Sequence, residues 1–158
     1  MEFNLLAFVG AVGCCLVSII LAGTAAAKKE NKEWLENLNQ PKPSFVQSVM
    51  MKYLHVLGIV FYLLFGYVLY QLIVGGGGIF AIVVTVTIVQ LMGLAPFLLY
   101  TTKKWRAFFY VNSVSFVLLI FLIFLLLESP ILAVLVAIYL LWYLFDFIYW
   151  YRLMKLNE

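Results

Sequence analysis

The stretch that decides the fold is Tyr139–Arg152, which reads YLLWYLFDFIYWYR. It is an apolar run, dense in aromatic residues, that carries a single acid, Asp146. Trp142, Phe145 and Tyr149 recur at intervals of three and four residues, so the stretch predicts a helix with an aromatic wall on one face. The aromatic residues that close it are typical of the belt where a transmembrane helix leaves the hydrocarbon for water. We therefore expect a membrane-spanning helix here, with its aromatic face turned toward a cavity.

The composition excludes a soluble domain. The chain has 158 residues, of which 66% are hydrophobic and only 11% are charged, whereas soluble domains are about half apolar and about a quarter charged. At about 20 apolar residues for each transmembrane helix, this length allows five spans with short connections. We therefore predict an all-α, polytopic membrane protein, a five-transmembrane-helix bundle that forms a single domain over residues 1–158.

Five apolar runs define the predicted spans, and a polar segment separates the first two. The runs cover residues 5–27, 48–74, 79–102, 107–127 and 131–152, and the polar loop covers 28–47. Within this loop, Trp34 and Leu38 lie four residues apart among charged residues, which predicts a short amphipathic helix on the membrane or over the mouth of a cavity. Pro41 and Pro43 are expected to end it, and Pro96 is expected to kink the third span.

The first run is predicted to be a retained helix rather than a signal peptide. Glu2 stands where a signal peptide carries basic residues, and the run is too long for its apolar region. Small residues recur at every fourth position, at Gly10, Cys14, Ser18 and Ala22. Such a stripe lets two helices approach closely in lipid. Packing inside the bundle is the favoured interpretation, and a dimer face is the alternative.

The basic residues set the expected orientation. With five spans, every lysine and arginine of the chain falls on the side that holds the 28–47 loop and the C-terminal tail. The positive-inside rule puts that side in the cytoplasm, so we expect the N-terminus outside and the C-terminus in the cytoplasm. The net charge of +3 is then a signal of topology, and nucleic acid is not expected as a partner.

Few residues of the predicted spans are suited to chemistry. Asp146 is a functional candidate, because an ionisable group within a span is costly. The favoured alternative for it is an acid near the interface that pairs with Arg152 or with a loop lysine. Lys52 and His55, three residues apart, would receive a ligand carboxylate or, for His55, a metal centre. For the histidine a packing role is favoured, since the sequence holds no cluster with the spacing of a metal site.

Two polar residues and one loose pattern complete the candidates. Gln90 and Asn112 must find partners within the bundle, and interhelical hydrogen bonds are favoured over ligand contacts. Leu144, Tyr149 and Arg152 satisfy a cholesterol-contact pattern that is common at the ends of membrane helices. The sequence shows neither a nucleophile–base pair nor paired carboxylates, so an enzyme is not expected.

Three local matches make the chain similar to the tryptophan-rich sensory protein family, also called the translocator protein (TspO/MBR) family. Lys42–Phe45 (KPSF) resembles the family's loop motif K-P-S-W, and Trp34 stands near the upstream tryptophan of that loop. Phe61–Tyr67 (FYLLFGY) is similar to the second-span pattern L-Y-x-x-M-G-Y. Tyr139–Phe145 (YLLWYLF) matches the fifth-span pattern Y-L-x-W-x-x-F. The resemblance covers nearly the whole chain in order and spacing.

The chain also departs from the family pattern. Gly58 and Pro96 stand where the second and third spans usually carry tryptophan, and Asn112 stands at a position that is usually acidic. Asp146 and Trp150 replace a small residue and an asparagine of the fifth span. Several of these positions belong to the family's ligand pocket, so the fold is expected to carry over more fully than the ligand.

The resemblance implies a five-helix bundle whose first loop covers a cavity open toward the cytoplasm. Family members bind tetrapyrroles such as protoporphyrin IX, and sterols or drug-like ligands. The chain is therefore expected to be a sensory or regulatory membrane protein that binds a tetrapyrrole or similar lipophile, with no required cofactor and with porphyrin or haem as the candidate ligand. The ligand-binding residues expected on this basis are Trp34, Lys42, Phe45, His55, Phe61, Tyr62, Phe65, Gln90, Asn112, Tyr139, Trp142, Phe145, Asp146 and Tyr149.

A different class of function fits the same sequence. Aromatic helices that pack against other membrane proteins would make the chain a non-catalytic scaffold or an accessory subunit, with side chains filling the pocket. The partner would then be a second copy of the chain or a larger membrane complex rather than a small molecule.

Overall fold

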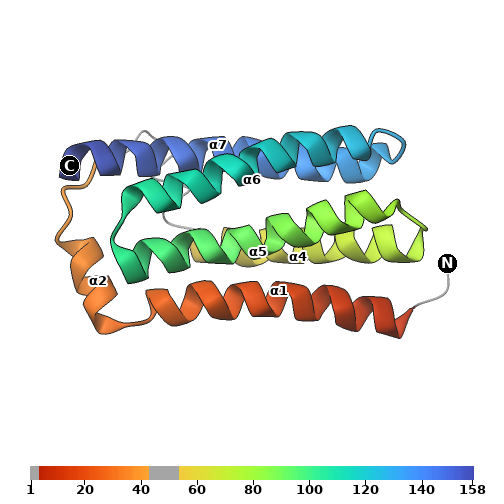
Figure 1. Cartoon of the computed structure of the whole chain (residues 1–158), viewed down its shortest axis with the longest axis horizontal. Helices are drawn as coiled ribbons and strands as arrows, with labels where there is room; N and C mark the ends of the chain where they lie inside the picture. The colour runs from red at the N-terminus through yellow and green to blue at the C-terminus, as the bar shows by residue number, and fades with distance from the viewer. Residues whose placement is uncertain (1–3, 43–53) are drawn as a thin grey trace.

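The computed structural model describes residues 4–42 and 54–158, and all regular structure in these residues is helical. Five helices are long and apolar enough to cross a membrane, which confirms the all-α, multi-pass membrane fold. They are α1 (Leu5–Ala26), α4 (Leu54–Val74), α5 (Ile79–Thr102), α6 (Trp105–Leu125) and α7 (Pro130–Asn157), and the short helix α2 (Lys29–Glu36) follows α1. The five long helices run along the longest axis of the molecule, and α2 lies at one end of them (Figure 1).

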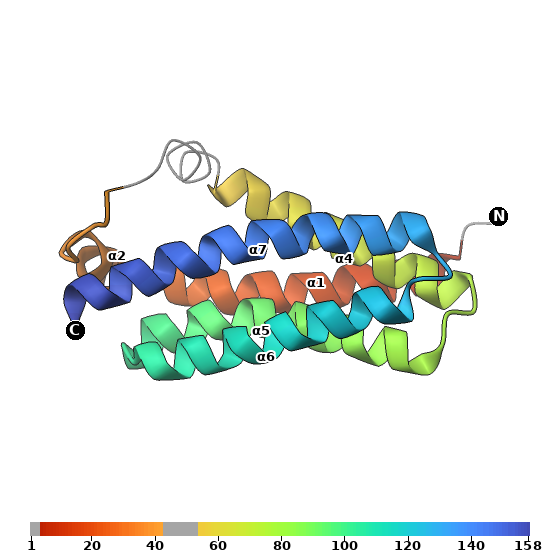
Figure 2. The same cartoon turned by 90° about the horizontal axis from the view of Figure 1, so that it is seen from above.

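The helices form a closed bundle. Each of α1, α4, α7, α6 and α5 contacts the next in this order, α5 contacts α1, and α4 also contacts α5. The view from above shows α7 passing close to α4 and α6 (Figure 2). Most of the large apolar side chains that the bundle leaves exposed belong to these five helices, as expected for a surface that faces lipid.

The helix boundaries follow the predicted spans closely. α5 covers 79–102 as expected, and α1 and α6 differ from the prediction by one or two residues. α7 begins with Pro130 at its first position and extends past 152 to Asn157. This extension is anchored because the Asn157 amide donates to the Asn39 carbonyl (3.0 Å) and accepts from the Asn39 N–H (2.8 Å). The expected start of the second span, at 48, lies outside the described residues.

The small residues of α1 pack inside the bundle, as the favoured interpretation predicted. The Ser18 hydroxyl donates to the Val89 carbonyl of α5 (2.5 Å). A Cβ atom built on Gly93 would lie 2.4 Å from the Ser18 carbonyl oxygen, so the two backbones are as close as a glycine allows. Gly10, in contrast, is exposed. Of the predicted stripe, Ser18 is buried, and Cys14 and Ala22 are partly buried. The other small residues that α1 buries are Ala7, Ala11, Cys15 and Ala25.

The predicted amphipathic helix is present as α2, and it covers the turn between α5 and α6. The Trp34 ring packs against Trp105 (5.8 Å between centroids) and Tyr100 (6.3 Å). The buried Asn31 amide donates to the Ala25 carbonyl (2.6 Å) and accepts from the Lys103 ammonium. Burial lowers the pKa of Lys103, and the Glu30 carboxylate opposes that shift. The loop after the first span is thus tied to the bundle.

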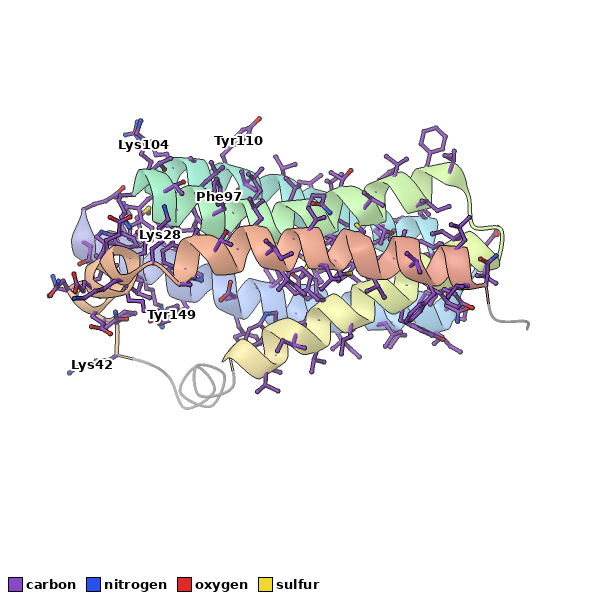
Figure 3. All side chains as sticks on the ribbon, turned by 90° about the horizontal axis from the view of Figure 1, so that it is seen from below. Lys28, Lys42, Phe97, Lys104, Tyr110 and Tyr149 are labelled. Atoms are coloured by element: carbon purple, nitrogen blue, oxygen red, sulfur yellow. The ribbon has the colours of Figure 1, made fainter. Side chains whose placement is uncertain are left out.

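Basic residues gather at the end of the bundle that carries α2. Lys28, Lys42 and Lys104 all lie at this end (Figure 3). The remaining basic residues that the structure describes belong to α2, to the α5–α6 turn, to the first turn of α6 or to the last turns of α7. Glu128 lies in the turn between α6 and α7, at the opposite end. The separation of charge expected from five spans is therefore present in space.

Candidate functional site

All five long helices line one cavity of about 380 Å³ in the half of the bundle that carries α2. This size is within the range of small-molecule sites, about 300–1,000 Å³. Of its lining side chains, eight are aromatic: Phe61, Tyr62, Tyr100, Phe108, Tyr139, Trp142, Tyr143 and Trp150. The rest are Ile19, Ala22, Gly23, Ala26, Gly58, Ile59, Met92, Ala95, Pro96, Asn112 and Asp146. A cavity so lined is suited to an apolar, flat molecule.

α7 supplies the largest share of the wall. Tyr139, Trp142, Asp146 and Trp150 succeed one another at intervals of three and four residues and line the cavity together, because residues so spaced share one face of a helix. Phe145 precedes Asp146 by one residue, or about 100° around the helix, and it is 45% exposed, outside the lining. The aromatic wall is therefore real, but its expected members were partly wrong.

Tyr149, the third expected member of the wall, has a different role. Its ring is buried, yet it is not part of the cavity lining. Its hydroxyl donates to the Gln40 side-chain oxygen (2.7 Å), which ties α7 to the loop that follows α2. Leu144 and Arg152 are exposed. The three residues of the cholesterol-contact pattern are thus not brought together on one surface.

The aromatic residues of α4 meet those of α7 at one side of the cavity. The Phe61 ring packs edge-on against Tyr139 (4.9 Å between centroids) and lies tilted against Trp142 (5.5 Å). Phe65 is fully buried and supports Tyr139 from the next turn (4.9 Å), so it stands behind the lining rather than in it. Phe61, Tyr139 and Trp142 thus form an aromatic cluster in the wall of the cavity.

The two polar residues expected to join helices do so. The Gln90 amide donates to the Cys14 carbonyl of α1 (3.0 Å), away from the cavity. The Asn112 side-chain oxygen accepts from the Tyr143 hydroxyl of α7 (2.5 Å), and its amide donates to the Phe108 carbonyl (2.8 Å). Asn112 and Tyr143 also line the cavity, so the interhelical bond and the pocket share these groups.

Asp146 lies in the wall of the cavity between Trp142 and Trp150, each four residues away. It is partly buried, and the Trp150 indole N–H is close enough to interact with its carboxylate. Among the described residues, ion pairs join only Lys29 to Glu33 and Lys155 to Glu158. The pair that was favoured for Asp146, with Arg152 or with a loop lysine, is therefore not formed among these residues, and Asp146 lines the cavity instead.

The residues of the first loop and of the start of α4 that were expected to bind the ligand either lie away from the cavity or are outside the described residues. Trp34 packs on the α5–α6 turn and does not line the cavity. Lys42 is exposed, in a shallow surface hollow beside Arg152 and Lys155. Phe45 lies outside the described residues, as does the side chain of His55 in the first turn of α4.

Several lining residues were not predicted. Tyr143 lies three residues before Asp146 and Trp150 four residues after it, so both share its face of the helix. This spacing could have been read from the sequence. Met92 and Pro96 share one turn of α5, where the proline cannot donate to the Met92 carbonyl and both residues line the cavity. Tyr100 follows Pro96 by four residues and so shares the face of α5 that lines the cavity. Its ring also packs against Trp34 of α2.

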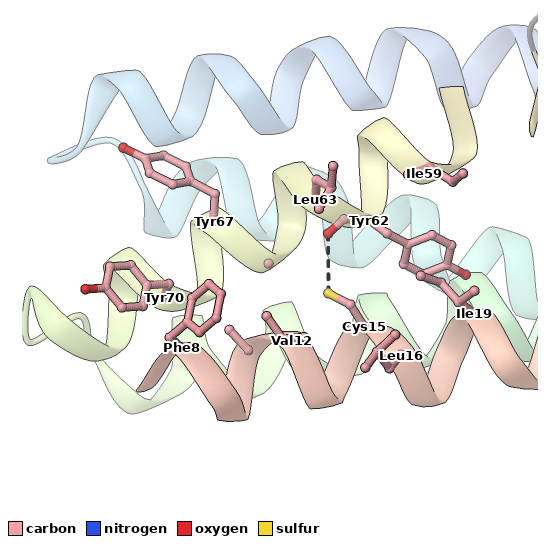
Figure 4. A pocket seen from close by; sticks show the side chains of 12 residues that line it. Phe8, Val12, Cys15, Leu16, Ile19, Ile59, Tyr62, Leu63, Tyr67 and Tyr70 are labelled. Atoms are coloured by element: carbon pink, nitrogen blue, oxygen red, sulfur yellow. Dashed lines mark hydrogen bonds between the residues drawn. The ribbon is translucent and has the colours of Figure 1, made fainter. Parts of the chain in front are cut away.

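A second hollow, of about 380 Å³, lies on the outside of the bundle between α1 and α4. Figure 4 shows the aromatic and aliphatic side chains of the two helices that line it, and the small residues Ala11, Cys15 and Gly66 also belong to the lining. The Cys15 thiol donates to the Tyr62 carbonyl across its floor (3.3 Å). No charged side chain lines this groove among the described residues.

Comparisons with protein-family models, with curated proteins and with solved structures found no match to this chain.

Proposed function

We propose that the chain is a membrane-embedded binding protein of sensory or regulatory type, which holds a lipophilic small molecule in the five-helix cavity. The observation that carries this proposal is the cavity itself, to which every long helix contributes and in which eight aromatic side chains converge. Phe61, Tyr139 and Trp142 would stack against the apolar body of the ligand. The bound molecule would be a tetrapyrrole, a sterol-like compound or another flat lipophile, in line with the resemblance to the tryptophan-rich sensory protein family.

The proposal includes an orientation. The described basic residues lie at the end of the bundle that carries α2, and the positive-inside rule favours that end in the cytoplasm. The N-terminus would then be outside, the C-terminus in the cytoplasm, and the cavity in the cytoplasmic half of the membrane. Accessibility of single introduced cysteines at Lys28 and Glu128 to an impermeant thiol reagent tests this, in a chain whose own Cys14 and Cys15 have been changed to serine or alanine.

Binding is tested on the purified protein in detergent, by Soret-band and tryptophan-fluorescence titration with protoporphyrin IX, its dimethyl ester and haem. We expect saturable binding of at least one of these that weakens about tenfold in Trp142→Ala, since a base-sized ring stacked on an aromatic side chain contributes about 1–3 kcal/mol. Phe145→Ala is the matched control, because this ring is on the same helix but outside the cavity. Partitioning equal to that of empty micelles, or equal loss in both variants, contradicts the proposal.

The groove between α1 and α4 supports a second candidate function, that of a scaffold or accessory subunit. Its apolar floor at Ala11, Cys15 and Gly66 is suited to a transmembrane helix of another protein or of a second copy, since small residues let helices approach closely. Filling it with Gly66→Phe would then release a partner that copurifies in mild detergent. Unchanged copurification would exclude the groove as the contact.

A further inference from the structure

The acid in the cavity wall narrows the chemical class of the ligand, and this inference rests on the proposed function. Among the described residues that line the cavity, Asp146 is the one acid, and no lysine, arginine or histidine is among them. The described basic residues lie elsewhere. Lys42 and Arg152 are exposed at the surface, and Lys103 is directed to Asn31 and the face of Trp34 (4.4 Å from the ring centroid).

The surroundings of Asp146 are those of a cation site. Trp142 and Trp150 flank it one turn away on either side, and Tyr139 and Tyr143 complete the same face of α7. Aromatic faces attract cations, and the attraction is stronger where water is excluded. A carboxylate set among such rings offers both an ion pair and ring faces to one ammonium group.

The energetics favour a cation over an anion. A carboxylate within a membrane span is costly unless an opposite charge accompanies it, and removing one partner of a buried pair leaves an uncompensated charge. A ligand ammonium would supply that partner and favour the ionised carboxylate. The propionates of a free porphyrin would instead bring negative charge into a cavity whose described lining holds an acid and no base.

We propose that the cavity selects lipophilic amines: an apolar ring system that lies on Phe61, Tyr139 and Trp142, with a protonated amine that pairs with Asp146. Asp146 is then the specificity-determining residue, and the aromatic cluster provides affinity that does not depend on charge.

Three pyrene probes separate these contributions, because they share one ring system and differ in the head group. They are 1-pyrenemethylamine (cationic), 1-pyrenemethanol (neutral) and 1-pyrenecarboxylate (anionic), titrated by energy transfer from tryptophan in an uncharged detergent with empty micelles as the reference. We expect the amine to bind about tenfold more tightly than the alcohol and the carboxylate to bind more weakly than the alcohol. The same charge rule predicts that protoporphyrin IX dimethyl ester binds more tightly than the free diacid.

The variant Asp146→Asn keeps the shape of the side chain and removes its charge. It should abolish the preference for the amine and leave the affinity for 1-pyrenemethanol within about twofold. Glu128→Gln, which removes an acid at the opposite end of the bundle, should leave the preference unchanged. The alcohol also reports on folding, since a misfolded variant would lose it.

The two proposals fail in different ways. Saturable, Trp142-dependent binding of 1-pyrenemethanol with no gain for the amine, or a gain that persists in Asp146→Asn, overturns the cation inference alone. Partitioning of all three probes that matches empty micelles, or that Trp142→Ala does not alter, overturns the proposed function as well.

Discussion

The two hollows of the molecule have the same volume and different chemistry. Each is about 380 Å³, but the cavity is lined by five helices and the groove by two. The cavity gathers a carboxylate, an amide and four phenols, whereas the polar side-chain groups that the described residues bring to the groove are the Cys15 thiol and tyrosine hydroxyls. Volume alone therefore does not mark a specific site in a membrane protein, because lipid fills any apolar groove on its surface. Convergent polar groups distinguish the cavity.

The two hollows share a wall. Ile19, Ile59 and Tyr62 line both, and the Tyr62 hydroxyl is within hydrogen-bond distance of the Ser18 hydroxyl (3.1 Å). α1 and α4 therefore separate the cavity from the lipid-facing groove, and the separation depends on how closely α1 packs against α4 and α5. Substitutions along this wall therefore distinguish the cavity from the groove most clearly.

The largest effect is expected from Gly93→Ala. Its Cβ would lie 2.4 Å from the Ser18 carbonyl oxygen, so α1 must move away from α5 and both hollows lose their shared wall. Because overpacking typically costs about 1–3 kcal/mol, we expect a loss of about 3 kcal/mol in the free energy of unfolding, measured in mixed micelles with a denaturing detergent. Gly10→Ala is the control, since no atom lies within 4 Å of its Cβ. Equal stability of the two variants would contradict the close approach.

Tyr62→Ala should have the next largest effect, because it removes the ring between the cavity and the groove. We expect a loss of about 2 kcal/mol in the free energy of unfolding, at the low end for truncating a large side chain since Tyr62 is only partly buried. The selectivity of the cavity for a charged head group should fall with it, because the site opens toward lipid. Tyr67→Ala, in the groove alone, is the control, and selectivity lost to the same degree there would contradict a wall at Tyr62.

Tyr143→Phe should cost about 1 kcal/mol of stability, the usual net contribution of a hydrogen bond. It removes the donor to the Asn112 side-chain oxygen (2.5 Å) and backbone carbonyl (2.8 Å), inside the cavity wall. Tyr110→Phe, which changes a ring that is 73% exposed, should be neutral. Identical unfolding curves for both variants would show that the bond between α6 and α7 does not contribute.

The smallest effect, and of opposite sign to that at Gly93, is expected from Gly66→Ala in the groove. The new Cβ would lie 3.5 Å from the Cys15 sulfur, an ordinary contact. Alanine is favoured over glycine in a helix by about 1 kcal/mol, so stability should rise by up to that amount while cavity binding is unchanged. A drop in stability would indicate that the groove is tighter than the structure has it.

Much of this fold follows from the sequence alone. The lengths of the apolar runs and the side on which lysine and arginine fall predict the number of spans and most of their ends. Gln90 and Asn112 were also predictable, because an amide within a span must find a partner and the nearest ones are on neighbouring helices.

The face of α7 was harder to predict. Periodicity identifies residues that share a face, but several overlapping sets fit a helix in which nearly every residue is apolar. Phe145 and Trp150 are equally aromatic, and only the packing of α4 and α6 against α7 decides that Trp150 lines the cavity and Phe145 faces outward. For Asp146, the ion pair with Arg152 was a local inference, whereas the observed position depends on the rotation of the whole helix.

Photolabelling tests the central claim most directly, because it reports which of the two hollows the ligand occupies. A diazirine derivative of 1-pyrenemethylamine would be bound to the detergent-solubilised protein, irradiated and mapped by mass spectrometry, with excess 1-pyrenemethylamine as competitor. We expect labels that the competitor prevents on the cavity segments 92–100 and 139–150, and less of this labelling in Asp146→Asn. Competed labels confined to 8–16 and 66–70, the parts of α1 and α4 that line only the groove, would contradict it.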